Sequence, residues 1–174
     1  MRGAFLDETI IQAIINAQNT QVKAVLATII RTEGSTPRDL GTQMLVMETG
    51  QTIGTIGGGT AEKLITKQAL ALSTAESEAS TEIHRLEINQ ETITAGIAVC
   101  GGNMEVLLEP VQGNHFWKIA QDLQMSGKDV VLVTSLANSS IFYFSIIYYI
   151  TTSSCFISIP RADLRRHRMS SSFK

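Results

Sequence analysis

A predominantly apolar run at residues 22–30, interrupted by Lys23 and Thr28, constrains the fold of this chain more than any other feature. The run is rich in β-branched residues, is too short for a typical helix, and is followed closely by Gly34. Runs of this kind are typical of strands that are buried on both faces. The sequence therefore predicts a buried strand at residues 22–30.

Helical and strand patterns alternate along the first 140 residues. Apolar residues at helical spacing predict helices at residues 5–17, 60–72 and 115–125. Strands are expected at residues 43–48, 51–56, 81–88, 104–108 and 129–136, the first two as a hairpin around Gly50. We therefore expect an α/β fold with a mixed β-sheet flanked by helices, in a single domain with an atypical C-terminal tail.

The composition excludes several classes of protein. With 44% apolar and 17% charged residues, a chain of 174 residues can bury a core, so disorder is excluded. A formal charge of −2 does not favour nucleic-acid binding, which needs a concentrated basic face. Two cysteines, Cys100 and Cys155, cannot form a disulfide framework, and no signal-peptide pattern opens the chain. We expect a cytoplasmic protein that binds neither nucleic acid nor membranes.

The composition changes near residue 140. Residues 1–140 carry a net charge of −6 and all 13 glycines, whereas residues 141–174 carry +4 and seven of the ten aromatic residues. We expect residues 1–138 to form the folded domain and residues 139–174 to form an aromatic and basic tail. The tail has three explanations: an aromatic β-rich segment, a membrane span over residues 141–159, or non-native sequence after a shifted reading frame or early stop. We favour the third, because the tail lacks the glycines and turns of the preceding chain.

The first of three glycine-bearing loops follows the predicted buried strand. Its sequence after Gly34 offers the hydroxyls of Ser35 and Thr36 and the forked cation of Arg38. A guanidinium suits phosphate or carboxylate, because its N–H groups match the two oxygens. The alternative is an ordinary exit from a strand, with Arg38 in solvent.

The second loop leads from a predicted strand into a predicted helix. Three consecutive glycines, Gly57, Gly58 and Gly59, expose backbone amides at the helix N-terminus, where anions bind. A phosphate or a pterin-like ligand would suit this turn, although it matches neither a Walker loop nor a dinucleotide fingerprint. Glu62 lies in the first helical turn, where it has the alternative role of complementing the helix dipole.

The third loop contains Cys100, Gly101 and Gly102. Little side-chain bulk surrounds the thiol, so we expect Cys100 to be solvent-accessible and reactive. The alternative is a small buried apolar residue, which is common for free cysteine. Metal binding is only weakly indicated by these residues, because the sequence has no CxxC motif and its histidines are scattered.

The ordered motifs GSTPR, GTIGGGTAE and CGG followed by MEVLLEP resemble the XdhC/CoxI family over about residues 11–136. Members are described as accessory proteins for molybdenum hydroxylases such as xanthine dehydrogenase and carbon monoxide dehydrogenase. They bind the molybdenum cofactor (molybdopterin), protect it, promote its sulfuration and help to insert it. The matching positions are Gly34, Ser35, Thr36, Pro37, Arg38, Gly57, Gly58, Gly59, Glu62, Cys100, Gly101 and Gly102.

The resemblance implies a cofactor chaperone rather than an enzyme, with no catalytic residues. It implies a molybdenum hydroxylase apoenzyme and a cysteine desulfurase as partners, and a homodimer as a further form. An anionic cofactor needs a cation and free amides close together, so Arg38 and the Gly57–Gly59 turn are expected on one rim of the cleft that holds Cys100.

The chain departs from the family pattern at two places. Thr60 stands where the family usually has a cysteine, so Cys100 would act alone beside the metal or its sulfur. Family members continue into a Rossmann-like domain, and nothing after Leu136 resembles one. Two rival interpretations stay open: a small nucleotide- or phosphate-dependent enzyme that uses Arg38 and the glycine turn for charge stabilisation, and a non-functional remnant.

Overall fold

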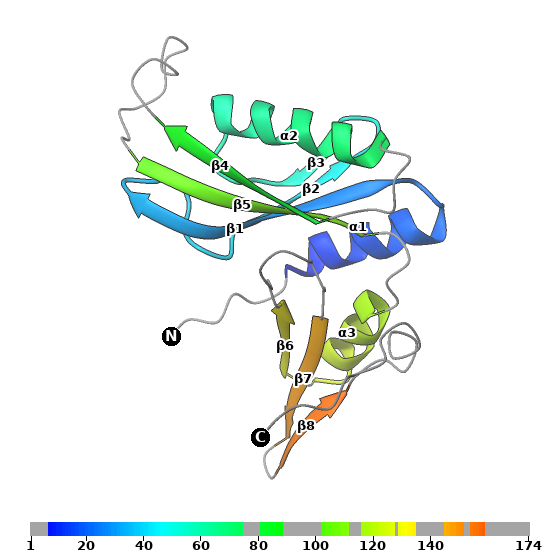
Figure 1. Ribbon diagram of the computed structural model, residues 1–174. Coiled ribbons are helices and arrows are strands. Elements are labelled where there is room, and N and C mark those ends of the chain that lie inside the picture. Colours follow the sequence, from blue (N-terminus) through cyan, green and yellow to red (C-terminus); the bar gives the residue numbers. More distant parts are fainter. Residues whose placement is uncertain are drawn as a thin grey trace, which may run out of the picture.

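The computed structural model describes residues 7–74, 81–88, 102–111, 116–127, 129–134, 145–151 and 154–158. The helices are α1 (Glu8–Asn19), α2 (Gly59–Thr74) and α3 (Phe116–Met125). The strands are β1 (Ala24–Gly34), β2 (Gln43–Met47), β3 (Thr52–Gly54), β4 (Glu82–Ile88), β5 (Gly102–Pro110), β6 (Asp129–Thr134), β7 (Ser145–Thr151) and β8 (Ser154–Ser158). Figure 1 shows their arrangement, which confirms the α/β class.

The strands form a large sheet in the order β3-β2-β1-β5-β4 and a small sheet in the order β6-β7-β8. Every pairing in both sheets is antiparallel, which differs from the expectation of a mixed sheet. The reason lies in the connection through α2, which joins the edge strand β3 to the opposite edge strand β4. It does not join neighbouring strands, so it does not create the parallel pair of a βαβ unit.

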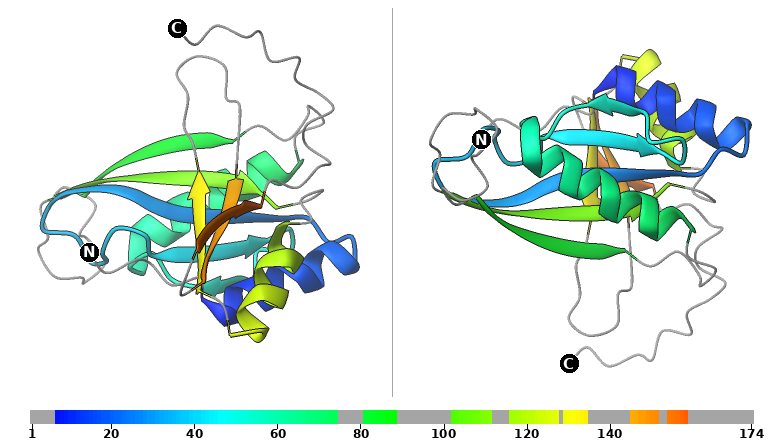
Figure 2. Two further views of the ribbon diagram at one scale, coloured as in Figure 1. Left: turned by 90° about the horizontal axis from the view of Figure 1, so that it is seen from below. Right: turned by 90° about the horizontal axis from the view of Figure 1, so that it is seen from above.

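Strand β1 lies at the centre of the large sheet, as its apolar run predicts. Ala24 and Leu26 belong to the core beneath α1 and α3, whereas Val25 and Ala27 belong to the core beneath α2. Figures 1 and 2 show α2 across one face of the sheet and α1 along the other. The strand is therefore buried on both faces, because its alternating side chains reach two separate cores.

Helix α1 begins at Glu8 because Asp7 caps it. The Asp7 carboxylate accepts hydrogen bonds from the backbone N–H groups of Thr9 at 2.8 Å and Ile10 at 3.4 Å. These bonds satisfy two amides that have no partner within the helix. Phe5, which the sequence places in this helix, lies outside the described residues.

The C-terminal part of the described chain contains more strand than its sequence pattern indicates. β6 pairs with β7, and β7 pairs with β8, so two strands lie within residues 139–174. This arrangement agrees with the first explanation of the tail, an aromatic β-rich segment. In the portions of the chain that the structure describes, no helix is long and apolar enough to cross a membrane. The division into residues 1–138 and 139–174 stays a prediction.

Candidate functional site

The first glycine loop starts where β1 ends. Gly34 has a φ of +74°, which turns the chain away from the sheet. The hydroxyl of Thr36 then donates a hydrogen bond of 3.1 Å to the carbonyl of Arg38. The Arg38 side chain is exposed, and it forms no ion pair within the described part of the molecule. Its guanidinium is therefore available to an anion from outside the chain.

The second loop packs directly against the first. A Cβ atom built on Gly57 would lie 2.5 Å from Cγ of Pro37, and the φ of Gly57 is +128°. Both the close approach and this φ require glycine. Cγ of Arg38 lies 3.7 Å from the same Cβ position. Gly57 therefore holds the glycine turn against Pro37 and the base of Arg38.

The described part of the third loop also contacts the first. Gly102 pairs with Gly34 at the end of the β1–β5 ladder. A Cβ atom on Gly102 would lie 2.5 Å from the carbonyl oxygen of Ser35, closer than a side chain allows. Cys100 and Gly101 lie outside the described residues. Three sequence motifs that are far apart in the chain thus meet around residues 35–37.

The amides of Gly57 and Gly58 in the glycine turn are already hydrogen-bonded within this chain. Oε1 of Glu62 accepts hydrogen bonds from the N–H groups of Ile56 at 3.2 Å and Gly58 at 2.9 Å, and from the hydroxyl of Thr55. The N–H group of Gly57 donates to Oγ1 of Thr55 at 3.1 Å. The sequence led us to expect that these amides attract an external anion. In the structure, the Glu62 carboxylate takes the place that such an anion would occupy.

A shallow pocket of about 280 Å³ lies beside the junction of the three motifs. It is lined by Arg31, Glu33, Arg85, Glu87, Asn103, Met104 and Glu105. Glu33 and Asn103 directly neighbour Gly34 and Gly102 in the sequence and pair with each other across the sheet. The pocket therefore continues the surface on which the first and third motifs meet.

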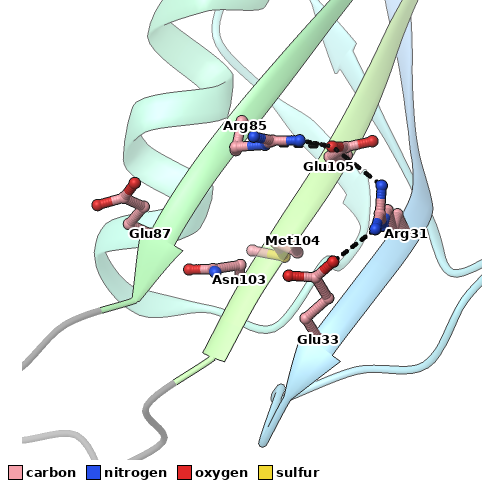
Figure 3. Close-up of a pocket in the computed structure, with 7 residues that line it drawn as sticks. All are labelled: Arg31, Glu33, Arg85, Glu87, Asn103, Met104 and Glu105. Atoms are coloured by element: carbon pink, nitrogen blue, oxygen red, sulfur yellow. Dashed lines mark hydrogen bonds and ion pairs between the residues drawn. The ribbon is translucent and has the colours of Figure 1, made fainter.

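Strand register arranges the polar side chains of the pocket in two rows (Figure 3). Arg85, Glu105 and Arg31 lie directly opposite one another on β4, β5 and β1. Glu87, Asn103 and Glu33 form the next row, two residues along each strand, which is a separation of about 7 Å. One row thus has a net positive charge and the other a net negative charge.

The positive row is an ion-pair network centred on Glu105. Nε of Arg85 donates to Oε1 of Glu105 at 3.1 Å, and Nη2 of Arg85 also donates to this oxygen. Nη1 of Arg31 lies 4.0 Å from Oε1 of Glu105, and Nη2 of Arg31 lies 2.6 Å from Oε1 of Glu33. The hydrogen bond from Arg85 holds the pKa of Glu105 below its ordinary value, and Glu105 in turn raises the pKa of Arg85.

The sequence analysis did not identify this pocket, although it contains one usable signal. Three strand segments carry polar residues at i and i+2, at Arg31 and Glu33, Arg85 and Glu87, and Asn103 and Glu105. Period-two spacing places each pair on one face of its strand. Only the pairing register shows that all three pairs share one face. The described residues include no group of three or more His, Cys, Asp or Glu side chains that could hold a metal ion.

The amino-acid sequence of this chain is similar to those of known proteins. The sequence profile of the XdhC and CoxI family matches residues 17–85, which include the first two glycine loops and β4 up to Arg85. A protein of Bacillus subtilis (strain 168), described as a probable subunit of xanthine dehydrogenase, is 31% identical over 135 residues. That alignment covers 75% of this chain and 39% of the Bacillus subtilis protein.

A solved structure shares the fold as well. The crystal structure of a xanthine dehydrogenase from Bacillus halodurans superimposes with a TM-score of 0.67 at 28% sequence identity. The match covers 84% of this chain and 44% of the solved chain. This chain therefore spans less than half the length of either relative.

Proposed function

Because the profile of the XdhC and CoxI family matches residues 17–85, we propose that this chain is an accessory protein for a molybdenum hydroxylase of the xanthine dehydrogenase or carbon monoxide dehydrogenase type. Its role would be that of a chaperone that binds the molybdenum cofactor and delivers it to the apoenzyme. The observation that carries this proposal is the meeting of the three glycine motifs, with Gly57 against Pro37 and Gly102 against Ser35.

The residues at this junction suit a phosphate-bearing cofactor through Arg38 rather than through the glycine amides. Arg38 is exposed and has no ion-pair partner among the described residues, so its guanidinium can bind phosphate. No atom lies within 4 Å of a Cβ position on Gly58, so the turn leaves open space on that side. The bound cofactor would supply the molybdenum centre, while residues of this chain would hold and orient it.

Cys100 completes the proposed site. It stands two residues before Gly102 in the sequence, and Gly102 packs against Ser35. We propose that the Cys100 thiol faces the same junction and acts as the ligand of the metal or of its sulfur, with Thr60 unable to supply a second thiol. A cysteine desulfurase would then be the sulfur source, and the site would operate in the cytoplasm, in a monomer or a homodimer.

The rival interpretation, a small nucleotide- or phosphate-dependent enzyme, uses both Arg38 and free amides at the glycine turn. Glu62 and Thr55 accept hydrogen bonds from the amides of Ile56, Gly57 and Gly58, so these three amides do not supply the charge stabilisation that this mechanism requires. We therefore retain the carrier function and use nucleotide turnover as a test of the alternative.

The carrier function is tested by purifying the full chain from cells that synthesise the cofactor. We expect molybdenum, measured by mass spectrometry, and pterin, measured by fluorescence after oxidation, to copurify with the protein. Arg38→Glu should lower the bound pterin by about tenfold or more, because a charge-assisted contact to phosphate is lost. The melting temperature should stay nearly unchanged, since the side chain is exposed.

Lys67→Glu is the matched control, because it makes the same charge reversal at an exposed position of α2. It should leave the bound pterin unchanged. Absence of both molybdenum and pterin from the wild-type protein, together with nucleotide turnover, would favour the enzyme instead. A large loss of stability in Arg38→Glu with unaltered pterin content would show that Arg38 is structural.

A further inference from the structure

The second row of the pocket contains two polar side chains that have no partner within the described part of the chain. Among the residues that the structure describes, the side chains of Glu87 and Asn103 form no hydrogen bond or ion pair. They lie directly opposite each other on β4 and β5, and both line the pocket. A carboxylate that can accept hydrogen bonds and an amide that can donate them therefore project from facing positions on two neighbouring strands.

The charge of the pocket determines which part of a ligand this row can face. Two arginines and three glutamates line it, so its net charge is −1, and both arginines are already paired, Arg85 with Glu105 and Arg31 with Glu33 and Glu105. An anionic group would be repelled by Glu87 and Glu33. A group that presents N–H donors is instead complementary to the Glu87 carboxylate.

We propose that this pocket binds the 2-amino-4-oxopyrimidine edge of a flat heterocycle, with the Glu87 carboxylate accepting from the ring N–H and the 2-amino group. The Asn103 amide donates to the 4-oxo oxygen. Both pterins and guanine carry this edge, and we assign it to the pterin of the molybdenum cofactor. The assignment rests on the proposed function, whereas recognition of the edge rests on the pocket alone.

The position and size of the pocket support a pterin ring at this place. A volume of about 280 Å³ is at the lower limit for small-molecule sites, so it suits one bicyclic ring rather than a whole cofactor. Glu33 and Asn103 adjoin the first and third motifs, so a ring in the pocket would extend toward the loop that carries Arg38. The ring and the phosphate of one cofactor would thus bind at separate ends of a continuous surface.

The experiment measures binding of free pterin to the full chain by fluorescence titration, with lumazine as the comparison ligand. Lumazine has an oxo group in place of the 2-amino group, so it offers Glu87 an acceptor instead of a donor. We expect wild-type protein to bind pterin at least tenfold more tightly than lumazine. Glu87→Gln should weaken pterin binding about tenfold and reduce the preference over lumazine, with an unchanged melting temperature.

Two further variants keep the test specific. Asn103→Asp replaces the amide donor by an acceptor at the same size, so it should also weaken pterin binding. Glu48→Gln removes an exposed carboxylate on the β2–β3 turn and should leave binding unchanged. Equal affinity for pterin and lumazine, or wild-type affinity in Glu87→Gln, would overturn the inference.

The result separates this inference from the carrier function. If the cofactor copurifies in an Arg38-dependent way while Glu87→Gln binds pterin normally, the carrier function stands and the pocket assignment is wrong. If Glu87 governs pterin binding but no molybdenum copurifies, recognition of the heterocycle edge by the pocket stands, whereas the carrier function and the assignment to its cofactor fail. Guanosine binding that is tighter than pterin binding would overturn the assignment to the cofactor.

Discussion

Replacing Glu62 with alanine should destabilise the protein by about 2 kcal/mol. Its Oε1 accepts hydrogen bonds from two backbone amides and from the Thr55 hydroxyl. A hydrogen bond to a charged group contributes about 1.5–3 kcal/mol, but water can replace part of this at a half-buried site. We therefore expect the three hydrogen bonds together to contribute about as much as one fully buried hydrogen bond to a charged group, which is about 2 kcal/mol. For a chain of this length, the melting temperature should fall by about 4–8 °C.

Thermal unfolding followed by Trp117 fluorescence measures this effect. Trp117 is the only tryptophan of the chain, and it is 3% exposed in the core between α1 and α3. Glu48→Ala is the control, because it removes an exposed carboxylate and should change stability by less than about 0.5 kcal/mol. Equal melting temperatures for Glu62→Ala and Glu48→Ala would refute the conclusion that the carboxylate holds the turn.

Two further predictions concern the glycine turn and the ion-pair network. Gly57→Ala should lower the free energy of unfolding by about 1–3 kcal/mol, because its Cβ would overlap Pro37 and its φ is positive. Gly58→Ala is the control and should cost less, because the space around its Cβ is open. Equal losses of stability in thermal unfolding would contradict the packing argument. The hydrogen bond from Arg85 lowers the pKa of Glu105 in the folded state. The pair therefore stabilises the folded state fully above about pH 4.3, the ordinary pKa of a glutamate, and this stabilisation is lost as the pH falls through the lowered pKa. The melting-temperature difference between wild type and Glu105→Gln should therefore shrink below about pH 4, and a difference that is the same at pH 7 and pH 3 would contradict it.

The sequence predicts the elements of this fold well because their signals are local. The buried position of β1 follows from its predominantly apolar sequence, and the β2–β3 turn follows from Gly50, which has a φ of +84°. The antiparallel sheet could not be predicted in the same way. It depends on which edge the chain reaches after α2, and no local pattern specifies that destination.

The position of Arg31 in the pocket depends on an irregularity in β1, which the regular alternation of side chains along a strand does not predict. A register shift between Ile29 and Arg31 interrupts the β1–β5 ladder. Ile29 faces the core beneath α2, so regular alternation would place Arg31 on that buried face. The irregularity instead puts Arg31 opposite Glu105, on the other face of the sheet. An inserted residue in one strand thus decides where two charged side chains lie.

The role of Glu62 shows a similar limit. From the sequence alone, Glu62 is an acidic residue in the first turn of a helix, a position where acidic residues are generally preferred. Its contacts with Ile56 and Gly58 depend on the fold of the preceding turn, which Gly57 shapes through its contact with Pro37. Two motifs that are separate in the sequence therefore determine each other's geometry.

The last prediction concerns residues 139–174, and it follows from where the cores lie. In the described part of the chain, every residue of the two buried cores lies between Ile10 and Ala120, with Val130 of β6 packed at the border. A chain that ends at Asn138 keeps all these core contacts and loses the ladders that β7 forms with β6 and β8, together with the contact between β7 and α3. We expect its melting temperature, measured by Trp117 fluorescence, to stay within about 3 °C of the full chain.

Its solubility should increase, because residues 141–160 form an uncharged, β-prone run without glycine. A chain that ends at Gly127 is the control: it also loses β6 and the contact of Val130, so it should unfold at a lower temperature. If the chain ending at Asn138 fails to fold while the full chain folds, then β7 and β8 supply stability that the two cores lack. Residues 1–174 would in that case form one cooperative unit, and the tail would be part of the domain rather than an addition to it.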